Sequence, residues 1–152
     1  MKRMNLAIFS ILSLLLTGWL PQSCGTREVA LSHEFKLKAG QEVLVKEAGI
    51  KVSLDEVLED SRCPTGVKCI WAGNGKVRVK VSKAKGEAVS VELNTSAGPQ
   101  SSTYEGYEVK LMRLDPYPRN GSTIGKDDYV ATLMVCKNCG ESSGAQGGSE
   151  VQ

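Results

Sequence analysis

The segment Lys76–Val81, with the sequence KVRVKV, decides the fold class of this chain. Valine alternates with a charged residue at every position, and successive side chains of a β-strand point to opposite faces of a sheet. Such a strand buries one face in a core and leaves the other in water. Antiparallel sheets accept this arrangement, whereas parallel strands are covered on both faces. The segment therefore predicts a half-exposed strand in an antiparallel sheet.

The same alternation recurs on both sides of this segment, between turns rich in Gly, Asn and Pro. The further expected strands are 35–37, 43–45, 50–54, 89–93, 109–114 and 129–135. No segment keeps a period of 3.6 residues for long, and 56–59 fits either one helical turn or a strand. Short strands at regular spacing predict an all-β domain, a small antiparallel sandwich or barrel of about seven strands.

The chain outside the strands divides into a few segments. We expect a linker over 24–33, the β domain over 34–139 and, because Gly, Ser, Glu and Gln dominate it, a disordered tail over 140–152. Two long loops, 94–102 and 115–128, interrupt the domain. Long loops on a rigid sheet are a common place for binding residues.

The N-terminus has the composition of an export signal. Lys2 and Arg3 precede an apolar run over 5–20, and small or polar residues follow it. We therefore predict a signal peptide over 1–23 and an exported protein of the cell envelope. Plain cleavage and an uncleaved anchor helix are the alternatives, since about 20 apolar residues span a bilayer.

Cys24 stands where a bacterial lipoprotein carries its acylated cysteine, and the region resembles such a signal. Ser23 and Gly25 fit the pattern, whereas Leu20 lies one position too early for its aliphatic residue. The resemblance implies lipidation of Cys24 and a membrane partner reached through that lipid anchor.

Charge and motifs limit the function classes. The chain has 19 Lys+Arg and 17 Asp+Glu, and the signal holds two of the basic residues, which leaves 17 of each sign. A balanced chain lacks the basic field that gathers nucleic acid. It carries neither a phosphate-binding glycine loop nor a Gly-x-Ser-x-Gly elbow, and its single histidine is His33. We expect a protein without enzymatic activity, without catalytic residues and without a cofactor.

Export favours disulfides for the cysteines. Cys63 and Cys69 enclose a segment in which Pro64 suits the second position of a turn and Gly66 the fourth. This turn brings the two cysteines within disulfide range of each other. The sequence therefore predicts a local Cys63–Cys69 disulfide that fixes the loop between two strands.

Cys136 and Cys139 form a Cys-x-x-Cys motif at the end of the last strand. A local disulfide is expected here, with cross-pairing to Cys63 and Cys69 as an alternative. A second alternative is a zinc or copper site made of all four thiolates. A third is thiol–disulfide chemistry at Cys136 and Cys139, although such motifs ordinarily open a helix, whose N-terminus lowers the thiol pKa.

Three residues near the first cysteine pair are candidates for binding. Asp60 and Arg62 form either a surface ion pair or a site that presents the arginine to an anionic or aromatic ligand. Trp71 is expected to pack against the sheet beside the disulfide, with a ligand platform as the alternative. The partner is then an envelope protein or a small ligand.

The motif DSRCP at 60–64 and the motif CIWAG at 69–73 together resemble a signature of small exported bacterial proteins, lipoproteins among them. The resemblance extends to Gly40-Gln41, to Val52-x-Leu54 and to the segment 129–133, and so covers most of the domain. That family has no established activity. The resemblance therefore implies an exported location and a fold, and no mechanism.

Overall fold

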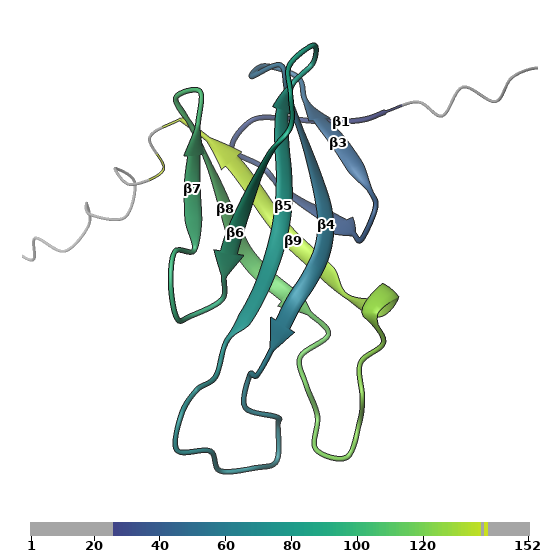
Figure 1. The fold of residues 1–152 in the computed structure, drawn as a ribbon, viewed down its shortest axis with the longest axis vertical. Helices are drawn as coiled ribbons and strands as arrows, with labels where there is room; N and C mark the ends of the chain where they lie inside the picture. The colour runs from purple at the N-terminus through teal and green to yellow at the C-terminus, as the bar shows by residue number, and fades with distance from the viewer. Residues whose placement is uncertain (1–25, 138, 140–152) are drawn as a thin grey trace, which may run out of the picture.

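The computed structural model describes residues 26–137 and 139, which form a two-layer β-sandwich (Figure 1). The strands are β1 (Arg27–Val29), β2 (Glu34–Lys38), β3 (Glu42–Val45), β4 (Ile50–Asp60), β5 (Gly75–Lys83), β6 (Val89–Asn94), β7 (Ser101–Tyr104), β8 (Tyr107–Asp115) and β9 (Val130–Cys136). One sheet has the order β1-β3-β4-β5-β6 and the other the order β2-β9-β8-β7. A short 3-10 turn, η1 (Lys126–Asp128), precedes β9. The predicted all-β class and sandwich are confirmed.

The core lies between the two sheets and follows the alternation of the sequence. In β5 the valines at 77, 79 and 81 are fully buried, while Arg78 and Lys80 lie on the outer face. Leu37, Leu114 and Leu133 from the second sheet meet this layer. Each fully buried Val or Leu contributes roughly 1.5–3 kcal/mol relative to exposure, so the strand period accounts for the architecture.

Two edge strands were not expected from the sequence. β1 lies inside the predicted linker and pairs with β3 in parallel, so a purely antiparallel arrangement is wrong at this edge. β7 lies at the end of the predicted 94–102 loop and pairs with β8. Both strands are short, and neither contains a fully buried residue. A strand that buries so little needs no apolar alternation, which is why the pattern did not reveal it.

The long strand β4 positions the loops at one end of the molecule. Segment 56–59 is part of this strand, and two register shifts between β4 and β5 mark β-bulges in it. β4 and β5 therefore form a long hairpin whose connecting loop, 61–74, lies at the lower end of the molecule in Figure 1. The loop between β8 and β9 reaches the same end.

Several predictions fall on residues outside the described part of the chain. The signal over 1–23, the lipidation of Cys24 and the disorder of 140–152 all lie there. Within the described part, no helix is long and apolar enough to cross a membrane. Among residues 26–137 and 139, the nine strands and every core residue lie between residues 27 and 136, so a chain that begins at Gly25 contains all of them.

Candidate functional site: a stapled apolar tip

A disulfide closes the projecting loop. Cys63 and Cys69 are bonded, with their Cα atoms 5.9 Å apart, which confirms the local pairing. The turn inside the ring starts one residue later than predicted. Val67 N donates to Pro64 O at 3.4 Å, so proline is the first residue of the turn and Gly66, with φ of +87°, the third. Glycine adopts this left-handed conformation without steric cost.

Polar groups at the base of the 61–74 loop bind one another. Ser61 N donates to Asn74 O at 2.7 Å, and Asn74 Nδ2 donates to Asn94 Oδ1 at 2.7 Å. The Asn74 Oδ1 atom accepts the backbone N–H groups of Ser96 and Ala97, both at 3.3 Å. The loop is thus fastened to β6 and to the 95–100 loop that follows it.

The 116–129 loop supports the same structure from the side. Thr65 N donates to Pro118 O at 3.0 Å, and Asn120 N donates to Thr65 O at 3.4 Å. Thr65 and Arg119 form an isolated parallel bridge through these contacts. Two segments more than fifty residues apart in the sequence are therefore joined at the lower end of the sandwich.

Asp60 and Arg62 form a bidentate ion pair. Arg62 Nε lies 2.7 Å from Asp60 Oδ1, and Arg62 Nη2 lies 2.7 Å from Asp60 Oδ2. Only 7% of the Asp60 side chain and 5% of the Arg62 side chain are exposed. The expected surface ion pair is therefore wrong, because the end of β8 and the loop after it cover both groups.

Arg62 also ties the two sheets together. Its Nη1 group donates to Leu114 O, and its Nη2 group donates to Pro116 O at 3.0 Å. Its guanidinium carbon lies 5.0 Å from the centre of the Tyr117 ring. A guanidinium has five N–H donors, of which these bonds and the ion pair use four. This leaves Arg62 little capacity to bind a ligand.

The charge state of the pair is set by its surroundings. Burial raises the pKa of the Asp60 carboxyl, but the hydrogen bonds and charge of Arg62 and a bond from Tyr129 lower it further than burial raises it. Tyr129 Oη donates to Asp60 Oδ2 at 3.0 Å. The pKa of Tyr129 is raised, first by burial and then by this bond. Both shifts favour an ionised Asp60 and a neutral Tyr129, as a structural clasp requires.

Trp71 does not pack into the sheet, contrary to the prediction. Trp71 is 81% exposed, Ile70 is 91% exposed and Val67 is 44% exposed. Gly73 directs this part of the loop outward. Its φ is +70°, and a Cβ at this position would overlap the carbonyl of Ser61. Because the loop turns back against its own base here, the residues just before Gly73 project away from the core.

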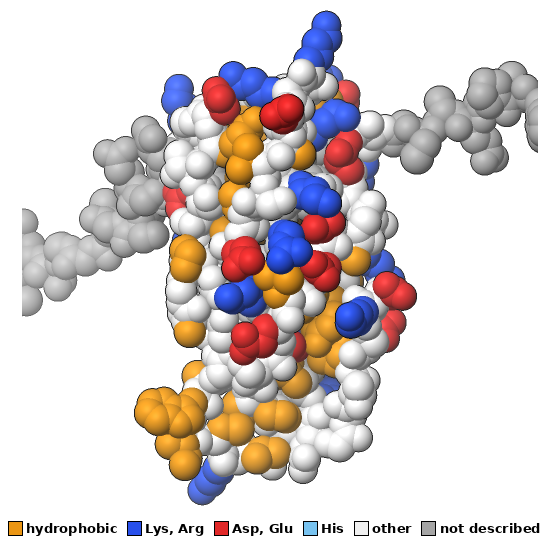
Figure 2. Space-filling model, in the orientation of Figure 1, with side chains coloured by type: hydrophobic (Ala, Val, Ile, Leu, Met, Phe, Trp, Pro, Cys, Tyr) orange, Lys and Arg blue, Asp and Glu red, His pale blue; other side chains and the backbone are white. Residues whose placement is uncertain are grey.

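We call Val67, Lys68, Ile70, Trp71 and Arg119 the tip surface. Figure 2 shows hydrophobic side chains gathered at the lower end of the molecule, with a basic side chain beside them and no acidic side chain among them on that face. The segments 61–74, 95–100 and 116–125 contain no Asp or Glu at all. Among the described residues, no carboxylate lies within ion-pair distance of Lys68 or Arg119. The tip surface is thus apolar and basic.

Two shallow cavities lie behind the tip surface. One, of about 460 Å³, borders Trp71, Asn74 and Ala97. The other, of about 350 Å³, borders Thr95, Met112 and Tyr117. Ala72, Gly73 and Ser96 line both cavities. Most of their surface is apolar, so they extend the apolar character of this end of the sandwich.

The end of β9, which carries Cys136, lies at the opposite end of the sandwich from the 61–74 loop, which carries Cys63 and Cys69 (Figure 1). Cys136 and Cys139 are bonded to each other, which confirms the second local pairing. Because the pairs are separated, the fold does not bring together the four cysteines of the alternative metal site. Cross-pairing is likewise not found.

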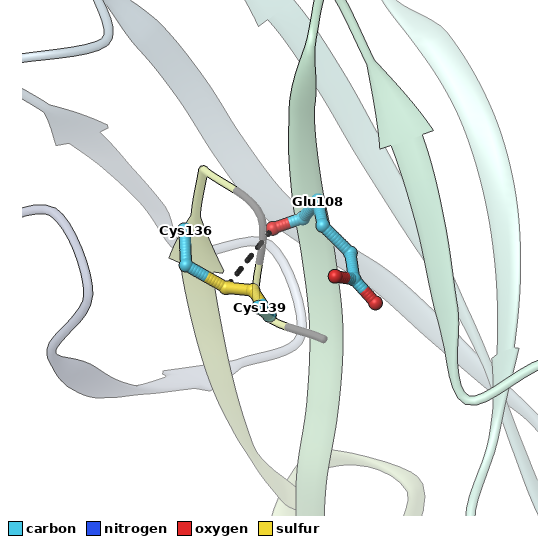
Figure 3. A group of neighbouring side chains, drawn as sticks. All are labelled: Glu108, Cys136 and Cys139. Carbon is cyan, nitrogen blue, oxygen red and sulfur yellow. Dashed lines mark hydrogen bonds between the residues drawn. A yellow bond between two sulfur atoms is a disulfide. The ribbon is translucent and has the colours of Figure 1, made fainter. Parts of the chain in front are cut away.

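Figure 3 shows the Cys136–Cys139 disulfide at the end of β9, with the backbone carbonyl of Glu108 facing it. Glu108, Cys136 and Cys139 offer three potential ligand atoms within 4.8 Å of one another. A disulfide supplies no thiolate for a metal ion. Cys136 ends a strand and does not open a helix, so this setting does not favour thiol exchange, which stays a prediction.

No protein-family model, curated protein or solved structure matches this chain. The site therefore rests on its own geometry. Sequence reasoning selected Asp60, Arg62 and Trp71 but missed Ile70 and Val67. The absence of acidic residues from 61–74, in a chain with 24% charged residues, is the signal that marks this loop.

Proposed function

We propose that this chain is a non-enzymatic binding module of the cell envelope that engages its partner through the tip surface. The observation that carries the proposal is the exposure of Ile70 and Trp71 on a loop that is closed by a disulfide and fastened on two sides. Large apolar side chains gathered in water mark interaction sites on soluble domains. A loop fixed before binding also loses little conformational entropy on binding.

The buried Asp60–Arg62 ion pair favours a binding role over a catalytic role for this end of the molecule. Asp60 and Arg62 are the buried charged pair beside the cavities, and each satisfies the other. Their hydrogen bonds position the loop, so we assign the two residues a structural role and not a catalytic one. Binding then depends on the projecting side chains.

The position of β1 fits attachment through Cys24. In Figure 1, β1 lies in the upper half of the molecule and the tip surface at its lower end. A lipid on Cys24, two residues before the first described residue, holds the domain near that upper half. The proposal thus assigns one end of the domain to membrane attachment and the other end to the partner.

The test compares binding of three chains, each beginning at Gly25, to the envelope fraction of the source cells. The variant Ile70→Ser removes an exposed side chain and is expected to lose at least about fivefold in affinity. The matched control Val89→Ser makes a similar change on β6, where Val89 is 47% exposed. It is expected to bind like the parent.

Equal binding of the parent and Ile70→Ser contradicts a role for the tip surface. The anchor is tested separately by mass spectrometry of the full chain taken from membranes. Acyl chains on Cys24 are expected, and an unmodified Cys24 contradicts attachment.

A further inference from the structure

The area of the tip surface fits a flat lipid interface better than it fits an interface with a protein partner. Ile70 and Trp71 project outward, and an aromatic side chain offers about 150–250 Å² for burial. A few such side chains fall well short of the roughly 800 Å² per partner in a stable protein interface. A lipid interface requires no matching pocket, and tryptophan is enriched at such interfaces.

The charges of the tip surface fit an anionic plane. Lys68 stands between Val67 and Ile70 in the sequence, and Arg119 is bridged to Thr65; both are exposed, and the segments 61–74 and 116–125 contain no acidic residue. On the outer face of β4 and β5, by contrast, every lysine and arginine forms an ion pair with a carboxylate. Lys80 Nζ lies 2.7 Å from Asp55 Oδ1, for example. Basic residues beside an anionic bilayer are attracted to it over about a Debye length.

The polar groups of the loop do not suit recognition of a polar ligand such as a sugar. Asn74, Ser96 and the backbone at the base of the loop bind one another, as described above. We propose that the tip surface docks on an anionic lipid bilayer, with Ile70 and Trp71 in the interface and Lys68 and Arg119 beside the lipid phosphates.

This inference rests on the proposed binding role of the tip surface but not on lipidation of Cys24. If Cys24 holds the opposite end in one membrane, the tip surface addresses a second, facing bilayer. If the chain is released by plain cleavage, the tip surface is its route to a membrane. The bilayer chemistry is the same in both cases.

The experiment uses the chain that begins at Gly25, which contains the nine described strands and has Trp71 as its single tryptophan. It is titrated with vesicles of phosphatidylcholine and with vesicles that also contain phosphatidylglycerol. We expect a blue shift of Trp71 emission with the anionic vesicles and quenching by brominated lipid. Higher salt is expected to weaken the binding.

Variants separate the apolar contribution from the charged one. Ile70→Ser is expected to weaken vesicle binding about tenfold while keeping the Trp71 reporter. The double variant Lys68→Glu/Arg119→Glu is expected to lose at least about tenfold on anionic vesicles. A control for net charge, Lys36→Glu/Lys85→Glu, changes two exposed lysines outside the tip surface. It is expected to stay within about twofold of the parent, as is Val89→Ser.

Three results overturn the inference. One is an unshifted Trp71 emission with every vesicle, and another is an equal loss for the tip and control charge variants. The third is tip-dependent binding to the envelope fraction that protease abolishes, with no binding to vesicles. This last result identifies a protein partner and leaves the proposed function standing. If, by contrast, no binding to vesicles is found and Ile70→Ser binds the envelope fraction like the parent, both proposals fail.

Discussion

At the scale of single residues, the Asp60–Arg62 pair shows how a buried charge is made tolerable. Two ions inside a protein lose their hydration, and the pair is acceptable only if hydrogen bonds satisfy both groups. Here two carbonyl groups and the Tyr129 hydroxyl complete the set. Removing one partner of such a pair costs about 3–5 kcal/mol, so the pair fixes the fold of this end.

The first prediction concerns the effect of pH on the clasp. The folded pKa of Asp60 lies below its ordinary value of 3.8, so its contribution is complete above that value. It is lost as the pH falls through the lowered folded pKa. Tyr129→Phe removes one bond to the carboxylate and is expected to cost about 1.5–3 kcal/mol at pH 7. The difference from the parent should shrink as the pH falls below 3.8 and through the lowered folded pKa, because a protonated Asp60 accepts a weaker bond.

Urea unfolding at several pH values measures this difference. Tyr107→Phe is the matched control, since the Tyr107 hydroxyl forms no hydrogen bond within the described part of the chain. A difference between Tyr129→Phe and the parent that stays constant in acid would refute the assigned role of Asp60.

At the scale of elements, the tip loop combines a covalent ring with a hydrogen-bonded base. The ring between Cys63 and Cys69 is small, so the disulfide restricts only a short part of the unfolded chain. Its greater effect is local: it holds Ile70 and Trp71 immediately after the ring. The β4–β5 hairpin carries the projecting loop, and hydrogen bonds to the 116–129 loop hold it from the side.

The second prediction removes this ring. Cys63→Ser/Cys69→Ser is expected to lose about 2–3 kcal/mol in the free energy of unfolding. It is also expected to bind the partner more weakly, because the loop must then be ordered on binding. Denaturant unfolding and vesicle titration measure the two effects. Unchanged stability together with unchanged binding would show that the ring has neither role.

At the scale of the whole molecule, the sandwich separates the core from the surface proposed to bind. The core lies between the sheets, the tip surface lies at one end, and the second disulfide lies at the other. Distant sites contribute to stability nearly independently. Changes in the core and at the tip surface should therefore have different consequences.

The third prediction tests this separation. Leu133→Ala empties part of the core and is expected to cost about 2–5 kcal/mol without changing binding of the folded chain. Ile70→Ser is expected to stay within about 0.5 kcal/mol of the parent in stability while losing binding. Thermal unfolding and vesicle titration of both variants and of their combination measure this. A strongly non-additive combination would mean that the tip surface and the core are coupled.

The sequence by itself determined the layers of this protein and favoured a local pairing within each cysteine motif, with cross-pairing left as an alternative. Alternation with a period of two is a local property, and it assigns the valines of 76–81 to the core whatever their partners are. The same holds for Cys63 and Cys69, since a turn of a few residues brings them together. The edge strands escaped prediction because they bury too little to leave a pattern.

Only the tertiary structure decided where Asp60, Arg62 and Trp71 lie. Burial of the ion pair depends on Leu114, Pro116 and Tyr129, which are more than fifty residues away in the sequence. A charged pair has no periodicity in the sequence from which its burial by distant segments could be predicted. Exposure of Trp71 depends likewise on how the loop leans on 95–100 and 116–129. Residue type alone predicts burial for a tryptophan, and the packing of distant loops reverses that prediction here.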